Sequence, residues 1–207
     1  RGLVMLDPLR QTCRQLLEEG KVQVVIGYGR TGAEGPAHPV FITQPEDVHQ
    51  LVWDDECYAN LTVFLSCGDV RKLGKPAIIV KGCDQRALVV LEKESQIDRS
   101  QIVVIGVACQ GVGRPTLPKC AACDARTPRG VDVVVGEASE DAKPVTEEVR
   151  YADLDTLMQK TPQERMAYWQ QELDRCIKCY ACRQVCPMCY CPRCIVDKNR
   201  PIAFTTS

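Results

Sequence analysis

Residues 75–85 read Lys-Pro-Ala-Ile-Ile-Val-Lys-Gly-Cys-Asp-Gln, an apolar run that ends in a Lys-Gly turn followed by a cysteine. The apolar residues at 77–80 are continuous rather than alternating, which is typical of a parallel strand buried on both faces. Two further runs, rich in β-branched residues, occupy positions 102–107 and 131–135. Residues 85–94 lie between the first two runs and are expected to form a crossover helix. The pattern predicts an α/β fold around a mostly parallel sheet.

The segment before this unit predicts one helix and one further strand. Leu9, Cys13 and Leu16 recur at helical spacing behind an Asp-Pro start, and Gly20 provides a stop signal. Residues 22–26 are apolar and indicate a buried strand. The first 140 residues are therefore expected to form the α/β body of the chain.

A glycine pattern follows that strand directly. Gly27, Gly29 and Gly32 form a G-x-G-x-x-G run. A dinucleotide-binding fingerprint needs a helix to open at the third glycine, but Pro36 and Pro39 exclude such a helix. The three glycines are kept only as flavin candidates, in a loop whose amides approach a phosphate. The sequence holds no Ser-His-Asp, H-E-x-x-H or Walker pattern, so no catalytic residue is assigned.

Four cysteines follow the predicted strands. Cys83 comes after the strand at 77–80, Cys109 after the strand at 102–107, and Cys120 and Cys123 form a C-x2-C pair before the last strand. Because right-handed crossovers bring the carboxyl ends of parallel strands to one edge, the four thiols are expected to converge there. Four thiols are the ligand set of a 4Fe-4S cluster. The alternative is that Cys83 and Cys109 are ordinary buried residues.

A second group of cysteines crowds the carboxyl end. Residues 176–194 hold seven thiols in nineteen positions and contain the C-x2-C-x2-C-x3-C-P run of bacterial ferredoxins. Structural zinc sites usually separate two C-x2-C pairs by a dozen or more residues. The spacing does not identify which cysteine is the fourth ligand of the first tail cluster. The tail is therefore expected to hold either one or two clusters. The candidate tail ligands are Cys176, Cys179, Cys182, Cys186, Cys189, Cys191 and Cys194.

The composition changes between these two groups. Residues after Gly136 are rich in Glu, Asp, Lys and Pro. We therefore expect a linker at 141–152 and a second unit at 153–207, formed by a helix and the small cysteine-rich iron-sulfur segment. Thr161-Pro-Gln-Glu is a capping box that starts this helix, and the stripe of Met166, Trp169 and Leu173 is expected to pack against the body.

Charge and cysteine usage limit the class of protein. The 207 residues carry a net charge of -1, which gives no bulk attraction to nucleic acid or membrane. No apolar run is long enough to span a bilayer and no export signal is present, so the fourteen cysteines point to the reducing cytoplasm. Three further cysteines are expected to lie on apolar faces, and none has another cysteine at the spacing of a shared ligand site. They are expected to be structural: Cys13, Cys57 and Cys67.

Residues 16–22, 75–85, 105–109, 120–124 and 131–137 occur in the order and spacing of a known family. Over roughly residues 9–137 the chain resembles the coenzyme F420 hydrogenase/dehydrogenase beta-subunit family. The resemblance implies a 4Fe-4S cluster, often FAD, and electron transfer between a catalytic partner subunit and a deazaflavin or other carrier. It also implies cluster ligation by Cys83, Cys109, Cys120 and Cys123.

These observations predict a non-catalytic iron-sulfur subunit of an anaerobic oxidoreductase complex of the hydrogenase, formate dehydrogenase or heterodisulfide-reductase type. Two or three 4Fe-4S clusters are expected, with FAD as a further candidate cofactor. The expected partners are other redox subunits, with ferredoxin or a deazaflavin as candidate carriers, and neither nucleic acid nor membrane insertion is expected. Two alternatives stay open: a flavin-containing reductase of a deazaflavin or nicotinamide carrier, and a zinc-binding interaction module.

Overall fold

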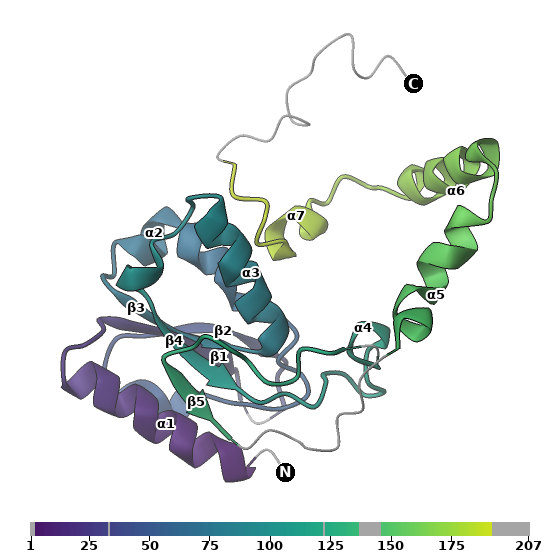
Figure 1. Ribbon diagram of the computed structural model, residues 1–207. Helices are drawn as coiled ribbons and strands as arrows, with labels where there is room; N and C mark the ends of the chain where they lie inside the picture. Colours follow the sequence, from purple (N-terminus) through teal and green to yellow (C-terminus); the bar gives the residue numbers. More distant parts are fainter. Residues whose placement is uncertain (1–2, 33, 122, 137–145, 192–207) are drawn as a thin grey trace.

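A computed structural model describes residues 3–191 of the chain, except 33, 122 and 137–145. It contains a five-stranded sheet in the order β2-β1-β3-β4-β5, with helices on both sides (Figure 1). The strands are β1 (Val24–Arg30), β2 (Ala37–Ile42), β3 (Pro76–Val80), β4 (Val103–Val107) and β5 (Val133–Val135). The α-helices are α1 (Leu3–Glu18), α2 (Gly68–Arg71), α3 (Gly82–Lys93), α4 (Pro118–Ala121), α5 (Glu147–Met158), α6 (Pro162–Asp174) and α7 (Ala181–Val185), and the 3-10 helices are η1 (Pro45–Gln50), η2 (Leu61–Ser66) and η3 (Arg99–Gln101).

The sheet is mostly parallel, which confirms the predicted α/β class. Strands β1, β3, β4 and β5 run parallel, with Val25 opposite Ala77 and Ile79 opposite Ile105. Only β2 is antiparallel, and it pairs with β1 at one edge of the sheet. The described helices cover both faces, with α1 on one side and α2 and α3 on the other (Figure 1).

Two apolar clusters fill the space between the sheet and its helices. One contains the α1 residues Leu9 and Cys13 together with Ile79 of β3, and the other contains Leu88 of α3 together with Ile78 of β3. Successive residues of a strand point to opposite faces, so a strand covered on both sides is apolar at every position. This is why residues 77–80 form a continuous apolar run.

The edge strand β2 was not predicted. It contains Pro39, which lies opposite Tyr28 of β1. A proline has no backbone N–H to donate to a neighbouring strand, so it is compatible with an edge strand and not with a central one. Helix α1 also begins earlier than expected, at Leu3, and includes Pro8.

The carboxyl-terminal helices differ from the sequence prediction in two respects. Helix α5 begins at Glu147, inside the predicted linker, whereas α6 starts at the predicted capping box, where the Thr161 amide donates to the Glu164 carboxylate over 2.8 Å. The expectation that Met166, Trp169 and Leu173 pack against the body is wrong, because these side chains are 61%, 50% and 69% exposed. Among the described residues, no helix is both long enough and apolar enough to cross a bilayer.

Candidate metal centre

Four cysteines converge at the carboxyl edge of the parallel sheet. Cys83 is the second residue of α3, directly after β3, and Cys109 follows the end of β4 by two residues. Cys120 lies in α4 and Cys123 follows it. All four line one small pocket of about 20 Å³. The crossover argument thus placed these thiols correctly, and Cys83 is the most exposed of the four.

Two glycines allow the loops around this pocket to approach one another closely. A Cβ atom at Gly82 would lie 1.9 Å from the carbonyl oxygen of Ala125, which no real contact permits. At Gly111 the backbone has a φ of +111°, and a Cβ atom there would lie 3.3 Å from the Cβ of Cys120. Side chains at either position would push apart the segments that carry the four thiols.

Backbone amides donate to two of the four sulfur atoms. The amide of Gly111 donates to Cys109 Sγ and the amide of Ala125 donates to Cys123 Sγ, each over 3.4 Å. The amide of Cys109 itself donates to the carbonyl oxygen of Arg126 over 2.8 Å. Such N–H···S bonds stabilise negative charge on sulfur and orient it, as iron-sulfur sites require. The donor set and the glycine cradle fit a cluster of four thiolate ligands.

A buried ion pair fixes the turn that presents Cys83. Lys81 Nζ lies 2.8 Å from Asp84 Oδ2, and the two side chains are only 4% and 2% exposed. The ammonium also donates to the carbonyl oxygen of Ala59 over 3.0 Å and to the hydroxyl of Tyr28. Because a buried charge is stable only when it is paired and hydrogen-bonded, this network holds the Lys-Gly turn in one conformation.

The pocket raises the pKa values of two of its thiols. Although Cys83 as a residue is exposed, desolvation of its thiol by the pocket, followed by the charge of Asp84, raises its pKa to about 11. Burial is also the largest cause of the raised pKa of Cys109. Desolvation disfavours the thiolate, so both groups carry protons at neutral pH in the metal-free chain. Binding of a metal or cluster would release those protons.

Asp124 fastens the C-x2-C loop to two helices. Its carboxylate lies 3.0 Å from Arg86 of α3 and 2.5 Å from Arg150 of α5. Hydrogen bonds from Arg86 and then Arg150 lower the pKa of Asp124 to about 2. The residue directly after Cys123 therefore connects the thiol pocket to the first helix of the carboxyl-terminal segment.

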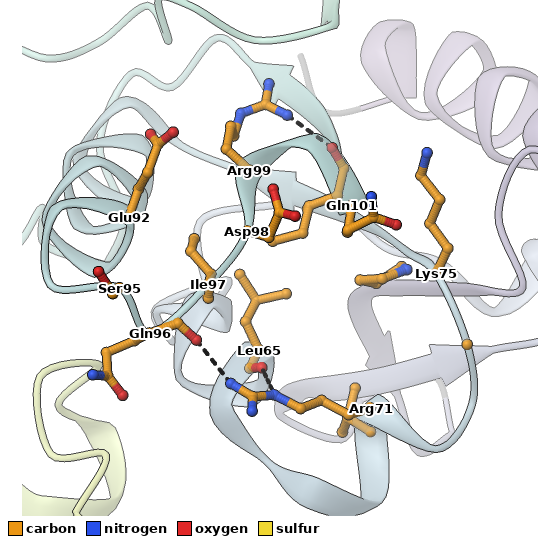
Figure 2. Close-up of a pocket in the computed structure, with 14 residues that line it drawn as sticks. Leu65, Arg71, Lys75, Glu92, Ser95, Gln96, Ile97, Asp98, Arg99 and Gln101 are labelled. Atoms are coloured by element: carbon orange, nitrogen blue, oxygen red, sulfur yellow. Dashed lines mark hydrogen bonds between the residues drawn. The ribbon is translucent and has the colours of Figure 1, made fainter.

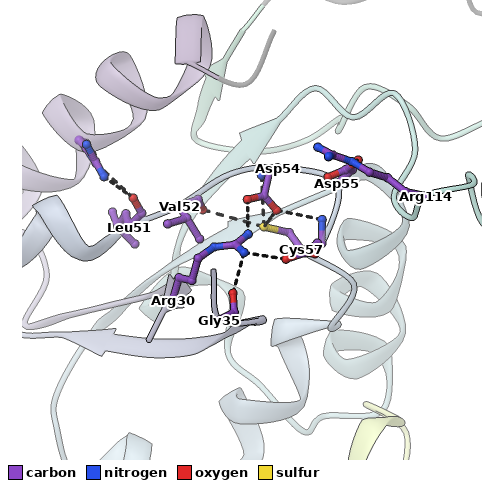
Figure 3. Close-up of polar contacts among 10 residues, drawn as sticks. Arg30, Gly35, Leu51, Val52, Asp54, Asp55, Cys57 and Arg114 are labelled. Atoms are coloured by element: carbon purple, nitrogen blue, oxygen red, sulfur yellow. Dashed lines mark hydrogen bonds and ion pairs between the residues drawn. The ribbon is translucent and has the colours of Figure 1, made fainter. Parts of the chain in front are cut away.

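A second polar network, which the sequence did not reveal, supports the loop between Cys109 and Cys120. Arg30 at the end of β1 pairs with Asp54 at 2.5 Å and with Glu56 at 2.7 Å (Figure 3). In the same acidic segment, Asp55 pairs with Arg114, and its carbonyl oxygen accepts from the amide of Gly113 over 2.6 Å. The loop that carries Cys109 toward Cys120 is thus bound to the far end of β1.

The three cysteines expected to be structural divide into two groups. Cys13 and Cys57 are fully buried, and burial raises the pKa of each to about 12. Cys57 Sγ also accepts from the amide of Asp54 over 3.4 Å. Cys67 is exposed, so the expectation that it lies on an apolar face is wrong.

The tail cysteines form a separate group around α7. Cys176, Cys179, Cys182, Cys189 and Cys191 are exposed and Cys186 is partly exposed, whereas Cys194 lies outside the described residues. Lys178 and Tyr180 adopt left-handed backbone conformations with φ of 55° and 59°, and the amide of Lys178 donates to Cys176 Sγ over 3.4 Å. Within the part of the chain that the structure describes, no three His, Cys, Asp or Glu side chains are arranged to hold a single metal ion.

A hydrogen bond joins the described part of the tail to the body. The hydroxyl of Tyr190 donates to the carboxylate of Glu94, at the carboxyl end of α3, over 2.7 Å. Cys83 lies at the amino end of the same helix. Helix α3 therefore extends from the thiol pocket to the tail contact.

Two of the three flavin candidates have a packing role. Gly27 and Gly29 lie inside β1, not in a loop. A Cβ atom at Gly27 would come within 2.5 Å of the Leu51 side chain, and one at Gly29 within 2.4 Å of Val40. Gly32 follows the strand with a φ of +70°. Flavin binding at these positions stays a prediction.

A larger pocket of about 690 Å³ lies at the opposite, amino edge of the sheet, next to Pro76 and Ile102 (Figure 2). Two of its cations, Arg71 and Arg99, hold neighbouring segments of the fold together. Arg71 donates to the carbonyl oxygens of Leu65 and Gln96 over 2.9 and 2.8 Å. Arg99 pairs with Asp132 at 2.9 Å. The lining of this pocket includes no cysteine.

Comparison with known proteins finds relatives among formate dehydrogenase beta subunits. No family model matches the chain. The beta subunit of F420-dependent formate dehydrogenase 1 from Methanococcus maripaludis is 22% identical, and the match covers 90% of this chain and 72% of that protein. The beta subunit of F420-dependent formate dehydrogenase from Methanocaldococcus jannaschii is 48% identical over 31 residues, which is 15% of this chain and 8% of that protein.

Among solved structures, the F420-reducing [NiFe] hydrogenase complex of Methanosarcina barkeri contains a chain that is 17% identical, with a TM-score of 0.43. This match covers 50% of the present chain and 38% of that one. The long match to a formate dehydrogenase beta subunit confirms the resemblance to the coenzyme F420 hydrogenase/dehydrogenase beta-subunit family that the motifs predict.

Proposed function

We propose that this chain is an iron-sulfur electron-transfer subunit of a multi-subunit oxidoreductase, which relays electrons between the redox centre of a partner subunit and an acceptor. The convergence of four thiols from three segments of the chain in one pocket carries this proposal. Two matched relatives are beta subunits of F420-dependent formate dehydrogenases, which favours a complex of that type and a deazaflavin as the carrier.

Cys83, Cys109, Cys120 and Cys123 would hold a 4Fe-4S cluster, which would supply one-electron transfer at the carboxyl edge of the sheet. The chain contributes the rigid frame: Lys81 and Asp84 fix the turn before Cys83, and the amides of Gly111 and Ala125 hold two sulfur atoms in place. Cys83 is exposed, so a partner could approach the cluster from that side.

The tail would provide the remaining one or two clusters, through Cys176, Cys179, Cys182 and the four cysteines that follow. Helix α3 has the thiol pocket at its amino end and the tail contact at its carboxyl end. This arrangement supports electron transfer between the body cluster and the tail clusters. The eleven-residue separation between Cys83 and Glu94 corresponds to roughly 16 Å along a helix axis. The Tyr190 contact with Glu94 keeps the tail against the end of that helix.

The compartment follows from the same chemistry. Exposed cysteines that serve as cluster ligands must stay reduced until iron and sulfide are delivered, which favours the cytoplasm over an oxidising compartment. The proposed units, a body at 1–140 and an iron-sulfur segment at 153–207, account for the two separate sets of thiols.

Chemical analysis of the anaerobically purified chain tests this function. We expect about eight to twelve iron atoms per chain with an equal amount of sulfide, because two or three 4Fe-4S clusters require that content. Zinc near stoichiometry with little sulfide would contradict the proposal and favour the interaction module. Flavin quantified in the same sample decides whether the chain is also a flavin-containing reductase.

A further inference from the structure

Arg126 lies in the wall of the thiol pocket with one donor unused. It lines the pocket together with the four cysteines. Its Nε atom is buried and has no hydrogen-bond partner, although buried polar groups are nearly always satisfied. One terminal nitrogen donates to the carbonyl oxygen of Gln110 over 3.1 Å, and the Arg126 carbonyl accepts from the amide of Cys109. The Arg126 guanidinium is therefore held at Gln110, the residue after Cys109, while the backbone of Arg126 is hydrogen-bonded to Cys109 itself.

The charge of Arg126 has no ion-pair partner among the described residues, and its Nε atom is buried in the pocket wall. Lys81 also lines the pocket, but Asp84 pairs with it at 2.8 Å. The carboxylate of Asp124 is nearby in sequence, but it pairs with Arg86 and Arg150. Within the described residues, no carboxylate forms an ion pair with Arg126. Lys119 is the remaining cation of the lining, and it is exposed to solvent.

We propose that Arg126 is a positioning residue that raises the reduction potential of the cluster held by Cys83, Cys109, Cys120 and Cys123. This inference rests on the proposed function, since it requires that cluster. Four thiolates give an oxidised 4Fe-4S centre a net charge of about -2, and one electron makes it about -3. A fixed cation in a desolvated wall stabilises the more negative state more strongly, and a free N–H donor adds a hydrogen bond to sulfur.

Two substitutions separate this role from mere support of the loop. Arg126→Gln removes the charge and keeps a polar side chain, whereas Arg126→Lys restores the charge without the planar guanidinium. Lys119→Gln is the matched control, because it removes an exposed cation of the same pocket, where solvent already screens the charge. All three are made in the full chain in which serine replaces the seven tail cysteines, so that only the body cluster contributes to the spectrum.

The measurement is a potentiometric titration followed by the EPR signal of the reduced cluster, with iron quantified in each sample. We expect Arg126→Gln to keep its iron and to lower the ratio of reduced to oxidised cluster at a fixed potential by about tenfold, which is 59 mV for a one-electron couple. Arg126→Lys should recover most of this shift, and Lys119→Gln should change the ratio much less.

Full iron with an unchanged midpoint in Arg126→Gln would overturn the inference and leave the proposed function standing. Loss of iron from Arg126→Gln would assign Arg126 to structural support and overturn the inference as well. Absence of iron from the parent chain with the serine tail would instead overturn the assignment of the body cluster, and this inference with it.

Discussion

The carboxylate of Asp124 lies 2.5 Å from the guanidinium of Arg150, so the residue after the last cysteine of the body pocket is joined to α5. A second ion pair, at 3.0 Å, joins the same carboxylate to Arg86 on α3. One side chain thus connects the C-x2-C loop, a crossover helix of the sheet and the helix that leads toward the tail. Any displacement of α5 would be transmitted to the loop that carries Cys120 and Cys123.

Asp124→Asn should release α5 from the body. The amide cannot form either ion pair, so residues 147–158 should become more sensitive to limited proteolysis while the sheet stays protected. Asp69→Asn is the control, since Asp69 forms an exposed pair with Lys72 at 2.7 Å, and such pairs contribute little. Equal proteolysis of the two variants would show that the Asp124 pairs do not hold α5.

The same contact should resist mild acid. Arg86 and Arg150 lower the pKa of Asp124 to about 2 from an ordinary value of 3.8, so its carboxylate stays charged well below neutral pH. The stabilisation is present in full above the ordinary pKa and is lost only as the pH falls through about 2. An acid-tolerant protease should therefore cleave α5 more slowly in the parent chain than in Asp124→Asn down to about pH 3. Loss of this difference near pH 4 would show that the pKa of Asp124 is not lowered.

Gly82→Ala should disrupt the pocket far more than the same substitution at a matched glycine elsewhere in the chain. The new methyl group would overlap the carbonyl oxygen of Ala125, at 1.9 Å, so the turn before Cys83 and the loop after Cys123 must separate. We expect a loss of stability on the order of 2–3 kcal/mol and reduced iron content. Gly68 also begins a helix, but a Cβ atom added there would meet no other atom within 4 Å, so Gly68→Ala should leave the melting temperature and the iron content near those of the parent.

Assembly of the body cluster should accelerate with rising pH. The pKa of Cys83 is raised to about 11 from 9.0, so its reactive thiolate increases about tenfold per pH unit below that value. Reconstitution with ferrous iron and sulfide, followed by visible absorbance, should be faster at pH 9 than at pH 7. By linkage, the metal-free chain is stabilised by the protonated thiol at low pH and loses this contribution as the pH rises from 9 toward 11. A pH-independent rate would contradict thiolate control.

Cys83→Ser should remove iron from the body pocket and leave the tail iron in place. Cys67→Ser is the control, because Cys67 is also exposed but lies outside both groups of thiols. A purely structural role for Cys83 would leave the iron content of both variants unchanged.

Cys179→Ser tests the tail site in the same way. It should remove tail iron only, and loss of all iron would contradict two separate units.

The sheet was predictable because burial on both faces leaves a plain signal in the sequence. Residues 77–80, 102–107 and 131–135 are largely apolar runs, and a strand of the structure overlaps each of them. The meeting of Cys83 with Cys109 followed from the fixed handedness of parallel crossovers, without any knowledge of side-chain contacts. Edge strand β2 left no such signal, since only one of its residues, Ile42, is buried.

The supporting contacts could not be predicted in the same way. Arg114 and Asp55 are 59 positions apart, and Arg30 and Glu56 are 26 apart, so neither pair has a local spacing that marks it. The first half of helix α5 fell inside the predicted linker because residues 137–150 are rich in Glu, Asp, Lys and Pro, and none of the residues of α5 is buried. The spacing of apolar residues in a sequence reveals a helix only when those residues form a continuous apolar face. The apolar residues of α5 do not form such a face.

The most direct test of the body site uses the full chain with serine at Cys176, Cys179, Cys182, Cys186, Cys189, Cys191 and Cys194. Any iron that this variant retains must be held by the body. After anaerobic reconstitution we expect about four iron and four sulfide per chain, and an EPR signal of one reduced 4Fe-4S cluster after dithionite. A folded variant that retains neither iron nor sulfide would contradict the assignment of Cys83, Cys109, Cys120 and Cys123 as a cluster site.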